Sequence, residues 1–272
     1  MTILQAIILG AVQGLTEFLP VSSSGHLVLT EHLLNVPVNT DVTFEVFVHF
    51  GTLLSVVLAL WTDIREIVQS TIHALGGIRQ APRQYKENEH FRLAILIILG
   101  SIPAAYIGIR FEEQITEVFT DPKLVAVMLV VTGLMLFLTR LAPAPNGKPV
   151  GLFSGLLIGC AQAMAIIPGI SRSGSTISVG MYLGISPVKS ARFSFLLSIP
   201  VIAGATLLKV IGIVRTGIEW DGMAAILAGT AVAFASGYLA IRFLLRVIEK
   251  GRFSIFSIYC LIVGTLGIIF LD

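Results

Sequence analysis

Two polar stretches that interrupt an otherwise apolar chain constrain its fold more than any other feature. Residues 13–26 read QGLTEFLPVSSSGH, and residues 162–176 read QAMAIIPGISRSGST. A shift of about 149 positions, which places Gly10 on Gly159, superposes them, and a fixed offset of this kind indicates an internal repeat. The matching pairs within the stretches are Gln13 and Gln162, Ser22 and Ser171, Ser24 and Ser173, and Gly25 and Gly174. We interpret the chain as a duplication whose two polar loops meet to form one site.

The composition indicates an integral membrane protein. Of the 272 residues, 55% are hydrophobic and only 12% are charged, whereas a soluble domain carries about 25% charged residues. The mean hydropathy is +0.91. The net charge of +2 comes without a basic tract, so nucleic acid is not expected as a partner. Cys160 and Cys260 lie in apolar segments, which disfavours a structural disulfide or a zinc site.

The apolar segments predict an all-α polytopic membrane protein with two repeats of five helices. In residues 1–140, a re-entrant hairpin at 3–34 precedes spans at 44–61, 91–110 and 122–140. In residues 150–272, a re-entrant hairpin at 151–184 precedes spans at 190–213, 222–247 and 253–271. Each hairpin arm is shorter than the roughly 20 residues that a span needs. Three spans per repeat invert the second repeat, and inverted repeats with broken helices place their sites near the midplane.

Charged residues between the spans predict the orientation. The segment 62–90, predicted to be the longest loop, and the turns at 141–150 and 247–252 are basic. Their Lys and Arg residues, with those beside them, are Arg65, Arg79, Arg83, Lys86, Arg92, Arg140, Lys148, Arg246, Lys250 and Arg252. The opposite loops carry Glu112, Glu113, Glu117, Asp121, Glu219 and Asp221. The positive-inside rule therefore places the first hairpin on the extracytoplasmic side, with the second hairpin entering from the cytoplasm.

Both polar loops have the residue types of an anion site. Each loop leads into a helix whose first turn is rich in Ser and Gly, and a helix N-terminus offers unpaired N–H groups and a positive dipole end. Arg172 adds a planar cation matched to phosphate oxygens, and an intramembrane Arg indicates function. The structural alternatives are N-capping by the serines and an ion pair between Arg172 and Glu17. The candidate phosphate contacts are Ser22, Ser24, Gly25, Ser171, Ser173, Gly174 and Thr176.

Acid–base and nucleophilic candidates cluster in the first stretch. Gln13 and Glu17 lie one helical turn apart, so their oxygens could hold Mg²⁺ or Ca²⁺ while phosphates complete its shell. Glu17 could instead act as a general base. His26 follows Ser23 by three residues, which permits a Ser nucleophile with a His base, or a His nucleophile or acid. Glu45 is a secondary candidate, weighed equally as an interfacial residue.

These stretches resemble those of the undecaprenyl-diphosphate phosphatase family, also called the bacitracin-resistance phosphatases. The resemblance covers essentially the whole chain and rests on residues 13–26 and 168–176, with lesser matches at 44–46 and 193–195. The family's first motif is often written with Glu or Gln, three residues, and then Glu. This chain has Gln13 there, which leaves Glu17 as the only carboxylate of that motif.

The resemblance implies hydrolysis of undecaprenyl diphosphate to undecaprenyl phosphate and phosphate at the outer face of the bacterial plasma membrane. This reaction recycles the lipid carrier for peptidoglycan synthesis and confers bacitracin resistance. The resemblance also implies a divalent cation, Mg²⁺ or Ca²⁺, and a homodimer. It gives Glu17 as the metal-linked or general-base carboxylate, Ser23 as the nucleophile, His26 as an acid/base or rival nucleophile, and Arg172 as the phosphate clamp.

Two other interpretations stay open at this stage. Inverted repeats with midplane sites also occur in transporters, so the chain could be a polyprenyl-phosphate flippase or a secondary transporter. The element formed by residues 24–26, Ser-Gly-His, also occurs in an unrelated superfamily of acid phosphatases. That superfamily requires further Lys-Arg-Pro and Arg-His motifs, which this sequence lacks.

Overall fold

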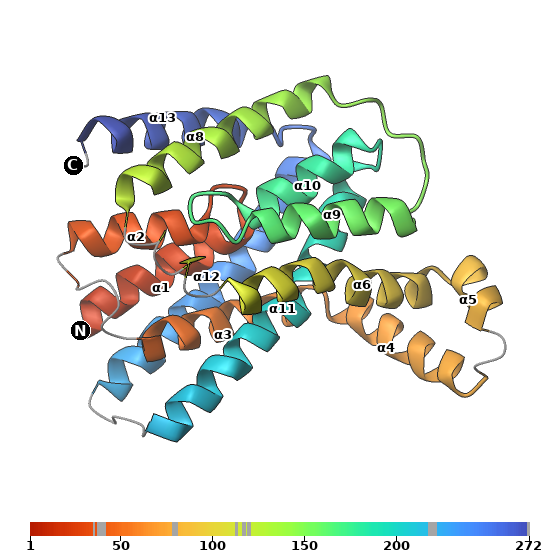
Figure 1. Cartoon of the computed structure of the whole chain (residues 1–272), viewed down its shortest axis with the longest axis horizontal. Coiled ribbons are helices and arrows are strands. Elements are labelled where there is room, and N and C mark those ends of the chain that lie inside the picture. The colour runs from red at the N-terminus through yellow and green to blue at the C-terminus, as the bar shows by residue number, and fades with distance from the viewer. Residues whose placement is uncertain are drawn as a thin grey trace.

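The computed structural model describes residues 1–34, 36, 42–77, 81–111, 114–115, 118, 121–216 and 222–270, and over these residues the chain is all-helical (Figure 1). The first half contains α1 (Ile3–Phe18), α2 (Ser23–Leu33), α3 (Val42–Ala59), α4 (Trp61–Leu75), α5 (Ala81–Glu87), α6 (Glu89–Arg110), α8 (Pro122–Leu138) and the 3₁₀ turn η2 (Thr139–Leu141). The second half contains α9 (Leu152–Met164), α10 (Arg172–Tyr182), α11 (Pro187–Thr216), α12 (Met223–Glu249) and α13 (Ile255–Phe270). Of the charges used for orientation, Arg79, Glu112, Glu113, Glu117, Glu219 and Asp221 lie outside the described residues.

Four of these helices are long and apolar enough to cross a membrane, namely α6, α8 with η2, α11 and α12. The count reaches five if the bent pair α3 and α4 forms one span. The predicted span at 253–271 is a helix of 16 residues, which is about 24 Å long and shorter than a hydrocarbon core of roughly 30 Å. The protein is therefore a multi-pass membrane protein, and by length and composition its described residues contain four or five candidate spans.

The prediction of a long polar loop at 62–90 is wrong, because α4 and α5 occupy most of this segment. The axes of α3 and α4 meet at a bend of 79°. Ile64 and Ile67 of α4 pack against the core, while Arg65 and Glu66 are exposed. Apolar residues at helical spacing within a polar segment thus form an amphipathic helix that packs along the bundle.

Each of the two predicted hairpins contains two helices separated by a break. The first break covers residues 19–22, where Pro20 cannot donate to a continuing helical ladder. The second covers residues 165–171, where Gly169 has a φ of +90°. A Cβ atom at Gly169 would lie 2.3 Å from the carbonyl oxygen of Val125, so only glycine fits this turn.

The first helix of each hairpin packs on a helix from the opposite half of the chain. Helix α1 packs on α12, and α9 packs on α6 (Figure 1). A Cβ atom at Gly10 would lie 2.3 Å from the carbonyl oxygen of Gly229, and one at Gly159 would lie 2.4 Å from that of Gly100. Both crossings therefore bring backbone against backbone, as small residues permit between membrane helices.

A buried apolar cluster lies beneath the two breaks and fixes their position. Phe18, the last residue of α1, meets Phe195 of α11 edge to face, with ring centroids 5.6 Å apart. Val21 from the first break and Ile177 from α10 belong to the same cluster. Helices α8 and α13 pack side by side along one edge of the molecule (Figure 1). The core cluster thus supports the two polar loops, and α8 packs against the helices that follow them, α2 and α10.

Candidate active site

Both polar loops border one cavity of about 250 Å³. From the loops and the adjoining helix ends come Glu17, Ser22, Ser23, Ser24, Ala165, Ile166, Ile170, Ser171 and Arg172. The opposite walls come from α3 and α11, with Glu45, Val46, His49, Val201, Ile202, Ala205, Thr206 and Lys209. The cavity therefore gathers acid, hydroxyl and basic groups from segments far apart in the sequence.

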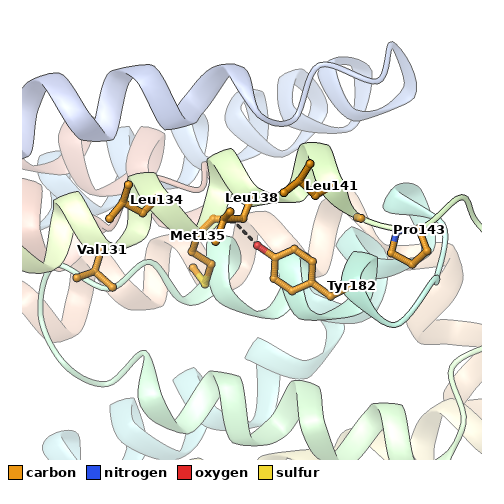
Figure 2. Close-up of a pocket in the computed structure, with 8 residues that line it drawn as sticks. Val131, Leu134, Met135, Leu138, Leu141, Pro143 and Tyr182 are labelled. Carbon is orange, nitrogen blue, oxygen red and sulfur yellow. Dashed lines mark hydrogen bonds between the residues drawn. The ribbon is translucent and has the colours of Figure 1, made fainter.

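A larger hollow of about 590 Å³ lies between α8 and the end of α10 (Figure 2). Its labelled lining residues are aliphatic, apart from Met135, Pro143 and Tyr182. The Tyr182 hydroxyl donates to the carbonyl oxygen of Met135, so this polar group is already used in packing (Figure 2). The hollow thus offers no acid or base for chemistry, and the 250 Å³ cavity is the candidate active site.

Glu17 is the centre of the hydrogen-bonding network in the cavity. Its Oε1 accepts from Nη2 of Arg172 at 2.7 Å, and its Oε2 accepts from Nε2 of Gln13 at 2.9 Å and from Oγ of Ser23 at 2.6 Å. The side chains of Glu17 and Arg172 are only 8% and 15% exposed. The ion pair considered as a structural alternative is present, and it joins the two loops directly.

The hydroxyl of Ser23 is oriented toward a proton acceptor. A distance of 2.6 Å to a carboxylate oxygen is typical of a charge-assisted O–H···O⁻ hydrogen bond. Ser23 opens α2, whereas Arg172 opens α10, and both line the cavity. The arrangement presents a hydroxyl, its base and a cation around one space, which is the geometry needed for attack on an anionic centre.

Ser22 holds the first loop in a rare backbone conformation. Its φ is +68° and its ψ is 99°, and it is the only non-glycine residue with a positive φ in the described part of the chain. Its Oγ caps α2 by accepting from the N–H of Gly25 at 3.4 Å and shares a hydrogen bond with Oγ of Ser24. Such backbone strain persists only where the surroundings enforce it, and it concentrates at functional sites.

The predicted phosphate-contact residues divide into two sets. Ser22, Ser24 and Ser171 line the cavity. The other four, which the lining does not include, are Gly25, Ser173, Gly174 and Thr176. Ser173 donates to the carbonyl oxygen of Leu19, and Thr176 shares a 2.6 Å hydrogen bond with Ser194. The division arises because successive residues in the first turn of a helix point to different faces.

His26 is directed away from Ser23. Its Nδ1 lies 2.8 Å from the carbonyl oxygen of Ser22, and its Nε2 lies 2.7 Å from the hydroxyl of Tyr259, whose ring it stacks on. Because a carbonyl oxygen only accepts, Nδ1 is the donor, and Nε2 of the neutral ring accepts from Tyr259. His26 is not among the residues that line the cavity. The structure thus pairs Ser23 with Glu17 and pairs His26 with the loop backbone.

Gln13 provides a free oxygen beside Glu17. Its Nε2 is used on Glu17, while its Oε1 is buried and has no hydrogen-bond partner. One nitrogen of Arg172, Nη1, is likewise buried and unpartnered. Within the described residues no three His, Cys, Asp or Glu side chains cluster closely enough to hold a metal. Gln13 itself is fully buried and is not among the residues that line the cavity.

Three residues of the site and its supports were not singled out in the sequence. Lys209 lines the cavity and lies 3.8 Å from Glu45, measured from Nζ to Oε2. Thr132 holds the second loop, donating to the carbonyl oxygen of Gly169 and accepting from the N–H of Ser171. An ionisable residue in an apolar span is a functional signal, and that rule would have found Lys209. The contacts of Thr132 and of Tyr259 carry no sequence signal.

The fold and the site define a class: multi-pass helical membrane proteins with a pocket that gathers acidic, hydroxyl and basic side chains at two breaks between helices. Within that class, the family model for the bacitracin resistance protein BacA matches residues 6–266. The chain belongs to this family, as its two polar stretches predicted.

Curated relatives match the chain over almost its whole length. The undecaprenyl-diphosphatase of Salinibacter ruber is 42% identical over 269 residues, covering 98% of this chain and 99% of the relative. The undecaprenyl-diphosphatase of Halothermothrix orenii is 44% identical over 272 residues, covering 99% and 98%. That of Moorella thermoacetica is 41% identical over 268 residues, covering 98% and 97%.

Proposed function

We propose that this protein is an undecaprenyl-diphosphate phosphatase that releases the terminal phosphate and returns undecaprenyl phosphate to the membrane. The observation that carries the proposal is the contact of Glu17 with both Ser23 and Arg172 inside one cavity. The names of the family and of its relatives supply the substrate. The product is the lipid carrier for peptidoglycan synthesis, and its recycling would confer bacitracin resistance.

In the proposed reaction, Ser23 is the nucleophile and Glu17 is its general base. The hydroxyl oxygen of Ser23 forms a bond to the terminal phosphorus as its proton passes to Glu17, and the bond from that phosphorus to the bridging oxygen breaks. Undecaprenyl phosphate leaves with the bond's electron pair. Glu17 passes its proton to the departing phosphate. It then takes a proton from water as the water oxygen bonds to the phosphorus, and it returns that proton to Oγ of Ser23 as the bond from Oγ to phosphorus breaks and inorganic phosphate is released. A water held by Glu17 could attack directly, and the Ser23 variant in the test below separates the two routes.

Arg172 would bind the terminal phosphate during this reaction. Its unpartnered Nη1 is available to a phosphate oxygen while Nη2 contacts Glu17. Helices α2 and α10 both begin at residues that line the cavity, so their N-termini would stabilise charge developing on the phosphoryl group. Ser22, Ser24 and Ser171 would add hydroxyl contacts. The contribution of Gly25, Ser173, Gly174 and Thr176 would be to shape the loops.

We also propose a requirement for Mg²⁺ or Ca²⁺. The buried Oε1 of Gln13, which has no partner, and the carboxylate of Glu17 are hard oxygen ligands of the kind these ions prefer. When bound, the ion would neutralise charge on the substrate phosphates. Gln13 also donates from Nε2 to Glu17, so this one residue would orient the carboxylate and coordinate the ion.

The proposed architecture is a pair of inverted repeats with re-entrant hairpins, with the site open to the extracytoplasmic side of the plasma membrane. Two observations support the repeat. The first helix of each hairpin packs closely on the opposite half of the chain, at Gly10 and at Gly159, and matching serines cap α2 and α10. The basic residues near 62–92 and 246–252 support the orientation. Cysteine substitution at Lys250 tests it, because a membrane-impermeant thiol reagent should modify that site only after the inner face is exposed.

The homodimer that the family resemblance implies remains a prediction of our proposal. Native mass spectrometry of the protein in detergent, at several concentrations, would detect it as a mass of two chains. A single-chain mass at every concentration would contradict it.

The decisive experiment measures phosphate release from undecaprenyl diphosphate by detergent-purified protein without any membrane gradient. We expect release with Mg²⁺ or Ca²⁺, none after EDTA, and none from the Glu17→Gln variant. Ser23→Ala should also be inactive if Ser23 attacks, whereas residual turnover would favour direct attack by water. Folded wild-type protein that releases no phosphate would overturn the proposal, and lipid flipping in vesicles would then test the transporter alternative.

A further inference from the structure

Lys209 is a cation in the apolar part of a membrane-spanning helix. It lies in α11, within the segment Pro187–Gly212 that is long and apolar enough to span. Its contact with Glu45 is long, at 3.8 Å, and the two side chains are 46% and 39% exposed. A half-exposed ion pair contributes little to stability, whereas placing an ionisable residue in a span is costly. Stability therefore does not explain this lysine.

The cavity has the size of a lipid head group. Its 250 Å³ equals the liquid volume of about eight water molecules, close to the nine phosphorus and oxygen atoms of a diphosphate. A 55-carbon tail cannot fit in this space and must lie outside it. The residues that bind within the cavity therefore contact the two phosphates.

Helix α11 forms a wall that runs from the loops to the mouth of the cavity. Val201, Ile202, Ala205 and Lys209 line it at helical spacing. Ile202 is almost buried and belongs to the core cluster beneath the two loops, whereas Lys209 is half exposed two turns farther along. Two turns correspond to about 10 Å, part of which the four-carbon stem of lysine can span. Lys209 thus lies toward the mouth, beyond the depth of the loops.

With His49 left aside, the charged side chains that line the cavity balance while no substrate is bound. They are two carboxylates, Glu17 and Glu45, and two cations, Arg172 and Lys209. A diphosphate brings at least two more negative charges. Arg172 sits at the second loop beside Ser23 and Glu17, where the terminal phosphate must lie, so the second phosphate needs a separate cation.

We propose that Lys209 binds the lipid-linked phosphate of the substrate, with Glu45 holding its ammonium group until the substrate enters. This assignment rests on the proposed phosphatase function and extends it. Arg172 binds the phosphate that is transferred, and Lys209 binds the phosphate that leaves with the lipid. Charge that develops on the leaving oxygen then meets Lys209, which makes this residue part of the recognition of a diphosphate.

Inhibition by each of the two reaction products measures one of the two phosphate-binding positions separately. Farnesyl diphosphate serves as a short, soluble substrate, and farnesyl phosphate and inorganic phosphate serve as inhibitors. In Lys209→Gln, the inhibition constant of farnesyl phosphate should rise by roughly tenfold, as expected for a lost hydrogen bond between charged groups, while that of inorganic phosphate stays unchanged. Lys209→Arg should retain most of the wild-type affinity. Lys189→Gln, which removes an exposed lysine from the other end of α11, is the matched control and should match the wild type.

Glu45→Gln provides an effect that misfolding cannot mimic. Freeing Lys209 should tighten farnesyl phosphate by roughly threefold, and this gain should disappear in the Glu45→Gln/Lys209→Gln double variant. An unchanged constant for farnesyl phosphate in Lys209→Gln, or a gain that persists in the double variant, would overturn the assignment. If the wild type releases no phosphate from undecaprenyl diphosphate, the proposed function itself has failed. The two failures are therefore distinguishable.

Discussion

The two loops around the cavity share one backbone design and differ in their chemistry. In each loop a serine caps the following helix, Ser22 for α2 and Ser171 for α10. In each loop the capping hydroxyl also shares a 3.3 Å hydrogen bond with the serine two residues later, Ser24 or Ser173. The two loops thus share the same capping arrangement at the start of the helix that follows.

The chemical groups stand at positions where the repeat has diverged. The diverged pairs are Glu17 against Ile166, Ser23 against Arg172, and His26 against Ser175. One loop supplies the base and hydroxyl, and the other supplies the cation at the position equivalent to the hydroxyl. Neither loop carries all these groups alone, which is the outcome expected if a duplicated loop kept its backbone design while its side chains diverged.

The largest effect is expected from removing the cation of the second loop. Arg172→Ala should lower turnover by about 10³-fold or more, as loss of an arginine that stabilises a transferred phosphoryl group typically does. It also leaves Glu17 buried and unpaired, at a cost to stability of about 3–5 kcal/mol. Phosphate release and thermal unfolding of the same preparation measure the two losses.

The double variant Glu17→Gln/Arg172→Ala separates catalysis from folding. With both charges removed, no buried carboxylate is left unpaired, so the unfolding temperature should recover while phosphate release does not. Near-normal turnover by Arg172→Ala would contradict the division of roles between the loops.

Much of this arrangement follows from the sequence, because the signals involved are local. Hydropathy locates four helices that are long and apolar enough to cross a membrane, Pro20 and Gly169 mark the two breaks, and the serines that follow mark the helix starts. The shift of about 149 positions indicates that the two loops are equivalent. The prediction of a loop at 62–90 failed because it weighed the polar composition above the apolar residues at helical spacing that form α4.

Apart from the meeting of the two loops, contacts between distant segments were beyond reach for a physical reason. The spacing of Ser23 and His26 permits a mutual contact, yet the ring of His26 turns to Tyr259, 233 residues away. Spacing restricts which side chains can meet, whereas tertiary neighbours decide which ones do. The same holds for Thr176, which shares the first turn of α10 with Ser173 but bonds Ser194 of α11.

An intermediate effect is expected at the serine that lies two residues after the capping serine in each loop. Ser24 lines the cavity, whereas its counterpart Ser173 donates to the carbonyl oxygen of Leu19. Ser24→Ala should raise KM by about fivefold, equivalent to one hydrogen bond of about 1 kcal/mol, with little change in stability. Ser173→Ala should leave KM unchanged and lower the free energy of unfolding by about 0.5–1.5 kcal/mol, because the carbonyl oxygen of Leu19 loses one hydrogen bond and keeps the one from the N–H of Val21. Equal effects of the two variants on KM would show that both hydroxyls bind phosphate.

The smallest effect is expected from removing the hydrogen bond between Tyr259 and His26, which supports the first loop. Tyr259 on α13 bonds His26, which bonds the carbonyl oxygen of Ser22, just as Thr132 on α8 bonds both Gly169 and Ser171 of the second loop. Tyr259→Phe keeps the stacked ring and removes one partly exposed hydrogen bond. Turnover should fall by about twofold to fivefold with KM unchanged, as the loss of 0.5–1 kcal/mol implies.

The His26→Asn variant decides what this chain of hydrogen bonds does. An Asn amide can still donate to the carbonyl oxygen of Ser22, which has the rare positive φ, but it cannot accept and release a proton. Turnover by His26→Asn within about tenfold of the wild type, with His26→Ala much lower, would assign His26 to holding Ser22 in place. Equal inactivity of the two folded variants would instead require proton transfer by the imidazole. The first loop would then carry two acid–base groups where the second has none at the equivalent positions, Ile166 and Ser175.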